Sequence, residues 1–257
     1  MESKKEKYRR KLDELVKGGK FIPGIYNYCD RWCERCTLSH RCLNYAHELE
    51  MMETKDDPAV NDIKNEKFWE QIRLSFEVAM DMISEDAERL GIDLDNLPDV
   101  EEPEHVESMA EKLAEKYGYA MHDWLKENHG KLKEKAEQLL VVHTDEKNAV
   151  KFADAWEVVQ WYSFFIPAKV HRAHLDLEER LNEEEDEYNM MSDNLGSAKI
   201  ALIAIDRSME ALSVIYPEMK AQEDEILKFL AQLSQIKKQM LDTFPTAMEF
   251  KRPGFDD

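Results

Sequence analysis

Four cysteines lie close together near the N-terminus of this 257-residue chain, which contains no others. The segment reads Cys29-Asp-Arg-Trp-Cys33-Glu-Arg-Cys36-Thr-Leu-Ser-His-Arg-Cys42. In an α-helix the first three would stand at i, i+4 and i+7 on one face, and Cys42 could fold back after the loop that follows. Thiolates are the soft ligands that zinc and iron–sulfur clusters select. The spacing therefore predicts one metal centre held by all four cysteines.

Two kinds of metal centre compete for this spacing. Structural zinc sites commonly use paired Cys-x2-Cys units that are well separated in sequence. This chain has one such unit, and all its cysteines lie within residues 29–42. Compact runs of this kind are typical of cubane clusters, which accept the spacing C-x2-C-x2-C-x3-C. The sequence therefore favours a [4Fe–4S] cluster, with zinc as the alternative.

Other residues of the segment could contribute to the centre. His40 or His47 could replace one cysteine, although a surface or packing role is the simpler interpretation of either histidine. Aromatic side chains beside the cysteines are expected to limit access of water, which tunes the potential of a cluster. These residues are Tyr26, Tyr28, Trp32 and Tyr45.

Two local spacings resemble the cysteine patterns of known families. Cys29-x3-Cys33-x2-Cys36 resembles the triplet of radical SAM enzymes, and Cys33-x2-Cys36-x5-Cys42 resembles the C-terminal triplet of a class of iron–sulfur nucleases. The resemblance implies cluster ligands and ends at these residues. Radical SAM chemistry needs a β/α barrel and an open iron, and the nucleases need a mixed sheet, whereas this sequence has no alternating strand pattern of useful length. We therefore transfer the ligand spacing and not the activities.

A second group of polar residues interrupts apolar segments further along the chain. Glu157 lies in the most apolar stretch, Asp206 follows the run 200–205, and His171 comes shortly after Pro167. A buried carboxylate must be paired, protonated or bound to a metal. Ordinary pairing is the simpler expectation, and a metal or acid–base site of Glu157, His171 and Asp206 is the alternative. The basic residues available for pairing are Arg172, Lys199 and Arg207.

The sequence contains one half of a di-iron pattern. Di-iron carboxylate proteins of the four-helix type use two Glu-x-x-His motifs. This chain has one, Glu102-Pro-Glu-His105, at a predicted helix start, where glutamate is common for capping and dipole reasons. The missing second motif weakens a di-iron interpretation. His122, beside the apolar stripe of the segment 104–140, is the best additional ligand if such a site exists.

Helical periodicity dominates the chain. Apolar residues recur at spacings of three and four, and neither a GxGxxG pattern nor a P-loop is present. The predicted fold class is all-α: an antiparallel bundle of about five long helices with the four-cysteine segment appended. Gly130 is expected to break or bend one helix and Pro167 to kink another. The predicted helical segments are 3–18, 39–53, 62–91, 104–140, 145–182, 192–216 and 217–241.

This pattern also predicts how the chain is divided. Residues 1–58 should hold the first helix and the metal-binding segment, and 59–243 the helical bundle. The segment 145–182 is apolar nearly all round between residues 155 and 166, which predicts a central position in the bundle. The tail, 244–257, contains two prolines and is expected to pack loosely.

Charge and hydropathy limit the classes of function. The formal net charge is −20, from 55 acidic and 35 basic residues, so general binding to nucleic acid is not expected. No apolar run approaches a membrane span, and the N-terminus lacks the apolar region of a signal peptide. The chain is therefore expected in the cytoplasm, where thiols stay reduced.

Three functions follow from these observations. The first is an iron–sulfur protein whose cluster is structural or exchanges electrons with a redox partner. The second is a zinc-stabilised helical adaptor that binds a basic protein through its acidic surface. The third is an enzyme with a carboxylate and histidine metal site in the core of the bundle. Substrate, biological process and oligomeric state are open at this stage.

Overall fold

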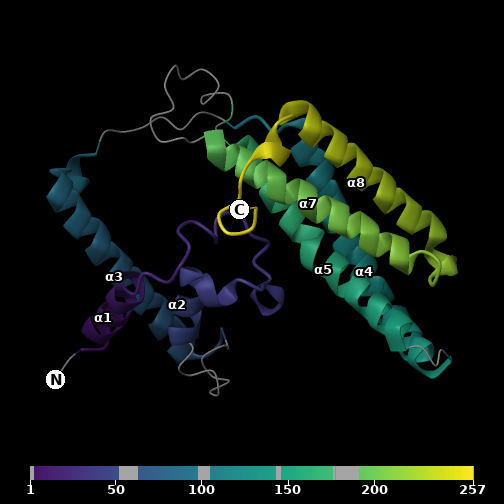
Figure 1. Ribbon diagram of the computed structural model, residues 1–257, viewed down its shortest axis with the longest axis horizontal. Helices are drawn as coiled ribbons and strands as arrows, with labels where there is room; N and C mark the ends of the chain where they lie inside the picture. Colours follow the sequence, from purple (N-terminus) through teal and green to yellow (C-terminus); the bar gives the residue numbers. More distant parts are fainter. Residues whose placement is uncertain are drawn as a thin grey trace. The chain divides into compact units, whose positions relative to one another are not determined.

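The computed structural model describes residues 3–51, 63–97, 105–142, 146–175, 177 and 191–256 (Figure 1). All regular structure in these ranges is helical and no strand occurs there, which confirms the predicted all-α class. The chain divides into two compact units. Residues Met1–Asn27 and Arg31–Pro103 form the first, and Tyr28–Asp30 and Glu104–Asp257 form the second. In the part of the chain that is described, no helix has the length and apolar character needed to cross a membrane.

The first unit is built from α1 (Lys4–Lys17), α2 (Leu43–Met51) and α3 (Glu66–Leu90). Ion pairs join α1 to α3, and the shortest are Lys5–Asp81 at 2.5 Å and Arg9–Glu85 at 2.7 Å. The helix α3 was expected to be the first helix of the bundle, which was predicted to span residues 59–243. It belongs instead to the first unit, in which its charged face pairs with α1. The apolar side chains that recur along α3 at spacings of three and four, and would form a buried face, are largely exposed, as at Phe76, Met80 and Ile83.

Within its described residues, the second unit consists of four long helices that share one core. They are α4 (Met109–Val142), α5 (Glu146–His174), α7 (Met191–Ile215) and α8 (Glu223–Thr243). Neighbouring helices run antiparallel, because contacts join the start of one helix to the end of the next. In α4 and α5, Glu111 meets His171 and His129 meets Trp156. The corresponding pairs elsewhere are Arg172–Asp193 and Tyr162–Arg207 for α5 and α7, and Asp206–Lys237 for α7 and α8, where Tyr216, just after α7, also meets Glu223 at the start of α8. Near the start of α8, Phe229 packs against Tyr117 and Trp124 of α4, and in the segment before it Gln222 and Glu218 meet Trp124 and Lys135.

The core of the second unit corrects two expectations. The helix α5 is not enclosed on all sides, since Trp161 and Phe164 in its apolar stretch are exposed. It packs chiefly on α4 and α7 and leaves its remaining face to solvent. The C-terminal tail is well packed rather than loose, because Phe244 and Ala247 are buried in the common core. Burying a phenylalanine contributes about 1.5–3 kcal/mol toward holding this segment in place.

A buried cation also holds the tail. Lys199 of α7 is almost fully buried, and its Nζ donates to the carbonyl oxygen of Phe250 at 2.6 Å. The same ammonium group lies 2.7 Å from the carboxylate of Asp256. Hydrogen bonds from Arg252, and next from Lys199, hold the pKa of Asp256 well below its ordinary value. The carboxylate is therefore ionised at neutral pH and balances the buried lysine.

Two glycines in α4 differ in their surroundings. The helix was expected to break at Gly130, but it continues through this residue to Val142. Gly118 lies where α4 packs directly against α5. A Cβ atom at Gly118 would stand 2.8 Å from Cγ of Pro167 and 3.0 Å from the carbonyl oxygen of Ser163. The absence of a side chain at Gly118 therefore permits this contact.

We expect Gly118→Ala to destabilise the second unit, because the new methyl group would force Pro167 or the backbone at Ser163 to move. The loss in free energy of unfolding should be about 1–3 kcal/mol. Gly130→Ala is the matched control, since nothing lies within 4 Å of its Cβ position. That change should stabilise the helix by about 0.5–1 kcal/mol. Urea unfolding of the full chain measures both, and equal effects would contradict the close packing at Gly118.

Candidate functional site

Two matching 3-10 turns carry the last three cysteines. The first, η1 (Cys33–Arg35), is closed by the N–H of Cys36, which donates to the carbonyl of Cys33 at 3.2 Å. The second, η2 (Ser39–Arg41), is closed in the same way by Cys42 and Ser39 at 3.1 Å. Cys36 and Cys42 then leave their turns in extended conformation, with φ, ψ of −81°, 119° and −104°, 118°. The two cysteines therefore have nearly the same backbone geometry.

The predicted helical face of cysteines does not form. Residues 29–32 are not helical, and Arg31 has a left-handed φ of 56°. That conformation is rare for a residue other than glycine and interrupts any helix that would join Cys29 to Cys36. The following helix begins at Leu43, later than the expected start near Ser39.

The cysteine side chains differ in exposure. Cys29, Cys33 and Cys36 are half-buried, Cys42 is buried, and the four form no disulfide. In the first unit, the sulfur atoms of Cys33, Cys36 and Cys42 do not all lie within 4.8 Å of one another. Thiolates on one tetrahedral zinc would lie about 3.8 Å apart, because each Zn–S bond is about 2.3 Å long. In a cubane each thiolate binds a different iron, so the sulfurs stand farther apart.

Asp30, the residue after Cys29, belongs to the second unit and is hydrogen-bonded to its helices α5 and α7. Its Oδ2 accepts hydrogen bonds from the hydroxyl of Tyr162 at 2.8 Å and from Arg207 at 2.7 Å. Its carbonyl oxygen accepts the indole N–H of Trp161 at 3.0 Å. Burial, more than the neighbouring groups, raises the pKa of Tyr162 to about 12. The phenol therefore keeps its proton at neutral pH and remains a donor to Asp30.

Tyr28, the residue before Cys29, is fixed to the same unit. Its ring packs edge-on against Phe250, with centroids 4.8 Å apart. A Cβ atom on Gly196 of α7 would stand 2.4 Å from the ring of Tyr28, so only glycine admits this contact. Both chain neighbours of Cys29, Tyr28 and Asp30, are therefore held in place by contacts within the second unit.

The remaining aromatic and histidine residues of the segment lie in ordinary contacts. Trp32 stacks under Arg35, whose guanidinium carbon is 3.9 Å from the ring centroid. The Nε2 atom of His47 is hydrogen-bonded to the hydroxyl of Tyr8 at 2.7 Å, and burial lowers its pKa. That contact occupies Nε2, one of the two ring nitrogens through which a histidine binds metal. The side chains of Tyr26 and Tyr45 are half-buried, and that of His40 is exposed.

The carboxylates proposed for the second site are exposed. Glu157 and Asp206 were expected to be buried because apolar residues surround them in sequence. Each instead projects from its helix to solvent while its neighbours form the core, and Asp206 pairs with Lys237 of α8. His122 is also exposed and lies against the ring of Phe164, with centroids 5.2 Å apart. The group Glu157, His171 and Asp206 is therefore not brought together.

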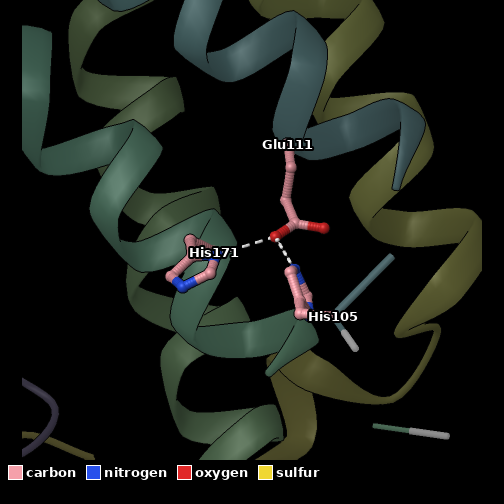
Figure 2. Close-up of side chains that lie close together, drawn as sticks. All are labelled: His105, Glu111 and His171. Carbon is pink, nitrogen blue, oxygen red and sulfur yellow. Dashed lines mark hydrogen bonds and ion pairs between the residues drawn. The ribbon is translucent and has the colours of Figure 1, made fainter. Parts of the chain in front are cut away.

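His171 meets two other residues instead (Figure 2). Within the described ranges, His105, Glu111 and His171 are the one group of three metal-ligating side chains whose ligand atoms all lie within 4.8 Å of one another. Oε1 of Glu111 is 2.7 Å from Nε2 of His105 and 2.8 Å from Nδ1 of His171. The two imidazole rings stand edge-on, with centroids 5.0 Å apart.

A capping box fixes Glu111. The residue lies in the first turn of α4, and its Oε2 accepts the N–H of Ser108 at 2.8 Å, while the hydroxyl of Ser108 accepts the N–H of Glu111 at 3.2 Å. Burial raises the pKa of Glu111, but hydrogen bonds from Ser108, His171 and His105 outweigh it and lower the pKa to about 2. The carboxylate is therefore ionised at neutral pH although its side chain is only 6% exposed.

The sequence analysis did not group His105, Glu111 and His171 into one cluster. His171 and His105 were both noted, but with other partners. The pattern Ser108-x-x-Glu111 signals a helix start and gives no hint of a contact with two histidines. The antiparallel packing of α4 on α5 creates that contact, and local spacing does not encode it.

Comparisons with protein-family models, with curated proteins and with solved structures found no match to this chain. Its function is therefore inferred from its own residues and their geometry.

We expect Tyr162→Phe to weaken the anchor beside Cys29. The buried ring is kept, but Asp30 loses a donor and Arg207 an acceptor, so the free energy of unfolding should fall by about 1–2 kcal/mol. The control is Tyr119→Phe in the same unit, where the residue is 59% exposed and the change should stay within about 0.5 kcal/mol. Urea unfolding at neutral pH compares the two. Equal stability of both variants would show that the hydroxyl of Tyr162 contributes nothing.

Proposed function

We propose that Cys29, Cys33, Cys36 and Cys42 hold one [4Fe–4S] cluster, which is structural or carries electrons in an otherwise helical protein. The observation that carries this proposal is the compact set of all four cysteines within residues 29–42. The two matching turns that end at Cys36 and Cys42 support it, because equivalent backbone geometry suits equivalent roles as ligands. Only three residues separate Cys29 from Cys33, so an extended chain keeps them within about 14 Å.

Local charge favours thiolate ligands in this segment. Arg31, Arg35 and Arg41 lie among the cysteines, while the whole chain carries a formal net charge of −20. Nearby arginines stabilise the thiolate form of cysteine. They also offset the net negative charge of a cubane held by four thiolates. With Asp30 and Glu34 counted, residues 29–42 carry a formal net charge of +1, from three arginines and two acidic residues, so the segment lacks the strong negative charge of the whole chain.

A zinc-stabilised adaptor is the second candidate. The overall acidic charge favours it, since such a surface attracts a basic protein partner. The compact run of four cysteines with a single Cys-x2-Cys unit favours a cubane over zinc, because structural zinc sites commonly use two such units that are well separated in sequence. Both candidates require reduced thiols, and we therefore assign the protein to the cytoplasm.

Anaerobic purification should yield a brown protein. We expect a broad absorbance band near ~400 nm and about four irons and four sulfides per chain, as a cubane requires. Absorbance, together with iron, sulfide and zinc analysis, measures this directly. A colourless protein with about one zinc per chain would reject the cluster and favour the adaptor.

Substitution of single cysteines should remove most of the iron. Cys36→Ser and Cys42→Ser each delete one ligand from the two matching turns. Ser39→Ala is the control, because Ser39 occupies the position in η2 that Cys33 occupies in η1. That variant should retain its iron and its colour. Unchanged iron content in the cysteine variants would contradict the proposed ligand set.

A further inference from the structure

We propose that His105, Glu111 and His171 bind a divalent first-row transition metal through two imidazole nitrogens and one carboxylate oxygen. Two histidines with one carboxylate is the ligand set of non-haem iron(II) sites and of several catalytic zinc sites. It holds the metal with three protein ligands and leaves other coordination positions open. The site lies in the second unit and contains no sulfur, so it does not depend on the cysteine centre.

Three separate parts of the chain supply the ligands (Figure 2). His105 precedes α4, Glu111 lies in the first turn of that helix, and His171 lies in the last turn of α5. Both histidine nitrogens approach one carboxylate oxygen, at 2.7 and 2.8 Å. A tetrahedral metal with bonds of about 2.0–2.1 Å would set its ligand atoms about 3.3 Å apart. The ligand atoms therefore need only a small rotation of the side chains to surround an ion.

Acidic side chains around the cluster favour the binding of a cation. A pocket of about 260 Å³ adjoins it, and Glu107, Glu111 and Glu115 all line this pocket. No lysine or arginine is among the residues that line it. A divalent metal ion would offset two of the three negative charges that these carboxylates carry when ionised. The same pocket offers room for water or a small ligand at the open coordination positions.

Helix capping alone does not explain the arrangement. A capping box requires only that Glu111 accept the N–H of Ser108, and Oε2 does so. That bond leaves Oε1 directed at the two histidines. It also serves as the outer-shell support that metal-binding carboxylates usually have. The convergence of two histidines on the remaining oxygen is the feature that a metal site accounts for.

Cobalt(II) is the probe for this site, because its spectrum reports the ligands. Thiolate ligands give intense charge-transfer bands in the near ultraviolet, whereas nitrogen and oxygen ligands do not. Titration of cobalt into the full chain should show weak visible bands from this site, separate from any thiolate bands that the four cysteines contribute. Zinc should compete for that site.

Two ligand variants and one control locate the cobalt. Glu111→Gln retains the capping box, since glutamine also caps at this position, and removes the anionic ligand. His171→Gln removes an exposed ligand at the end of α5. Each should weaken binding by more than the roughly 10–100-fold that loss of an outer-shell partner costs. His122→Gln removes another exposed histidine of α4 and should bind cobalt as the unaltered chain does.

The outcomes separate this site from the cysteine centre. Loss of the weak bands in Glu111→Gln and His171→Gln, with the bands retained in His122→Gln, supports the proposal whatever the fate of the cluster. If Glu111→Gln does not fold, His105→Gln provides the same comparison. Binding that is unchanged in these variants, or cobalt that shows only thiolate bands, overturns the proposal.

Discussion

The close approach of α4 and α5 at Gly118 sets the register of the second unit. Because no side chain stands at Gly118, the two backbones come together beside Pro167 and Ser163. In an antiparallel pair this contact determines which residues face each other toward both ends. Glu111 then meets His171 in one direction, and His129 meets Trp156 in the other. The histidine and glutamate cluster therefore depends on a packing contact that involves none of its own ligands.

Polar side chains of the second unit hold two segments that have no helical structure. Tyr162 and Arg207 bond Asp30, and Lys199 bonds the carbonyl of Phe250 and the carboxylate of Asp256. Each buried donor would be costly without an acceptor. The helices α5 and α7 therefore fix both the residue after Cys29 and the C-terminal tail.

The two proposed centres differ in the chemistry of their ligands. The cysteine segment offers soft thiolates among arginines, and the cluster at the start of α4 offers imidazole and carboxylate among acidic residues. Soft ligands select zinc or iron–sulfur clusters, and mixed nitrogen and oxygen ligands suit divalent metals with open positions. One chain can hold both, because neither ligand set contains a residue of the other.

The sequence by itself determined the all-helical class and the set of candidate thiolate ligands, because helical periodicity and cysteine spacing are local properties. It did not determine that α3 joins the first unit, that the tail is buried, or that Glu157 and Asp206 face solvent. Those features depend on which face of each helix finds a partner. Only the tertiary structure brought His105, Glu111 and His171 together, because the register of α4 on α5 is a long-range property of packing.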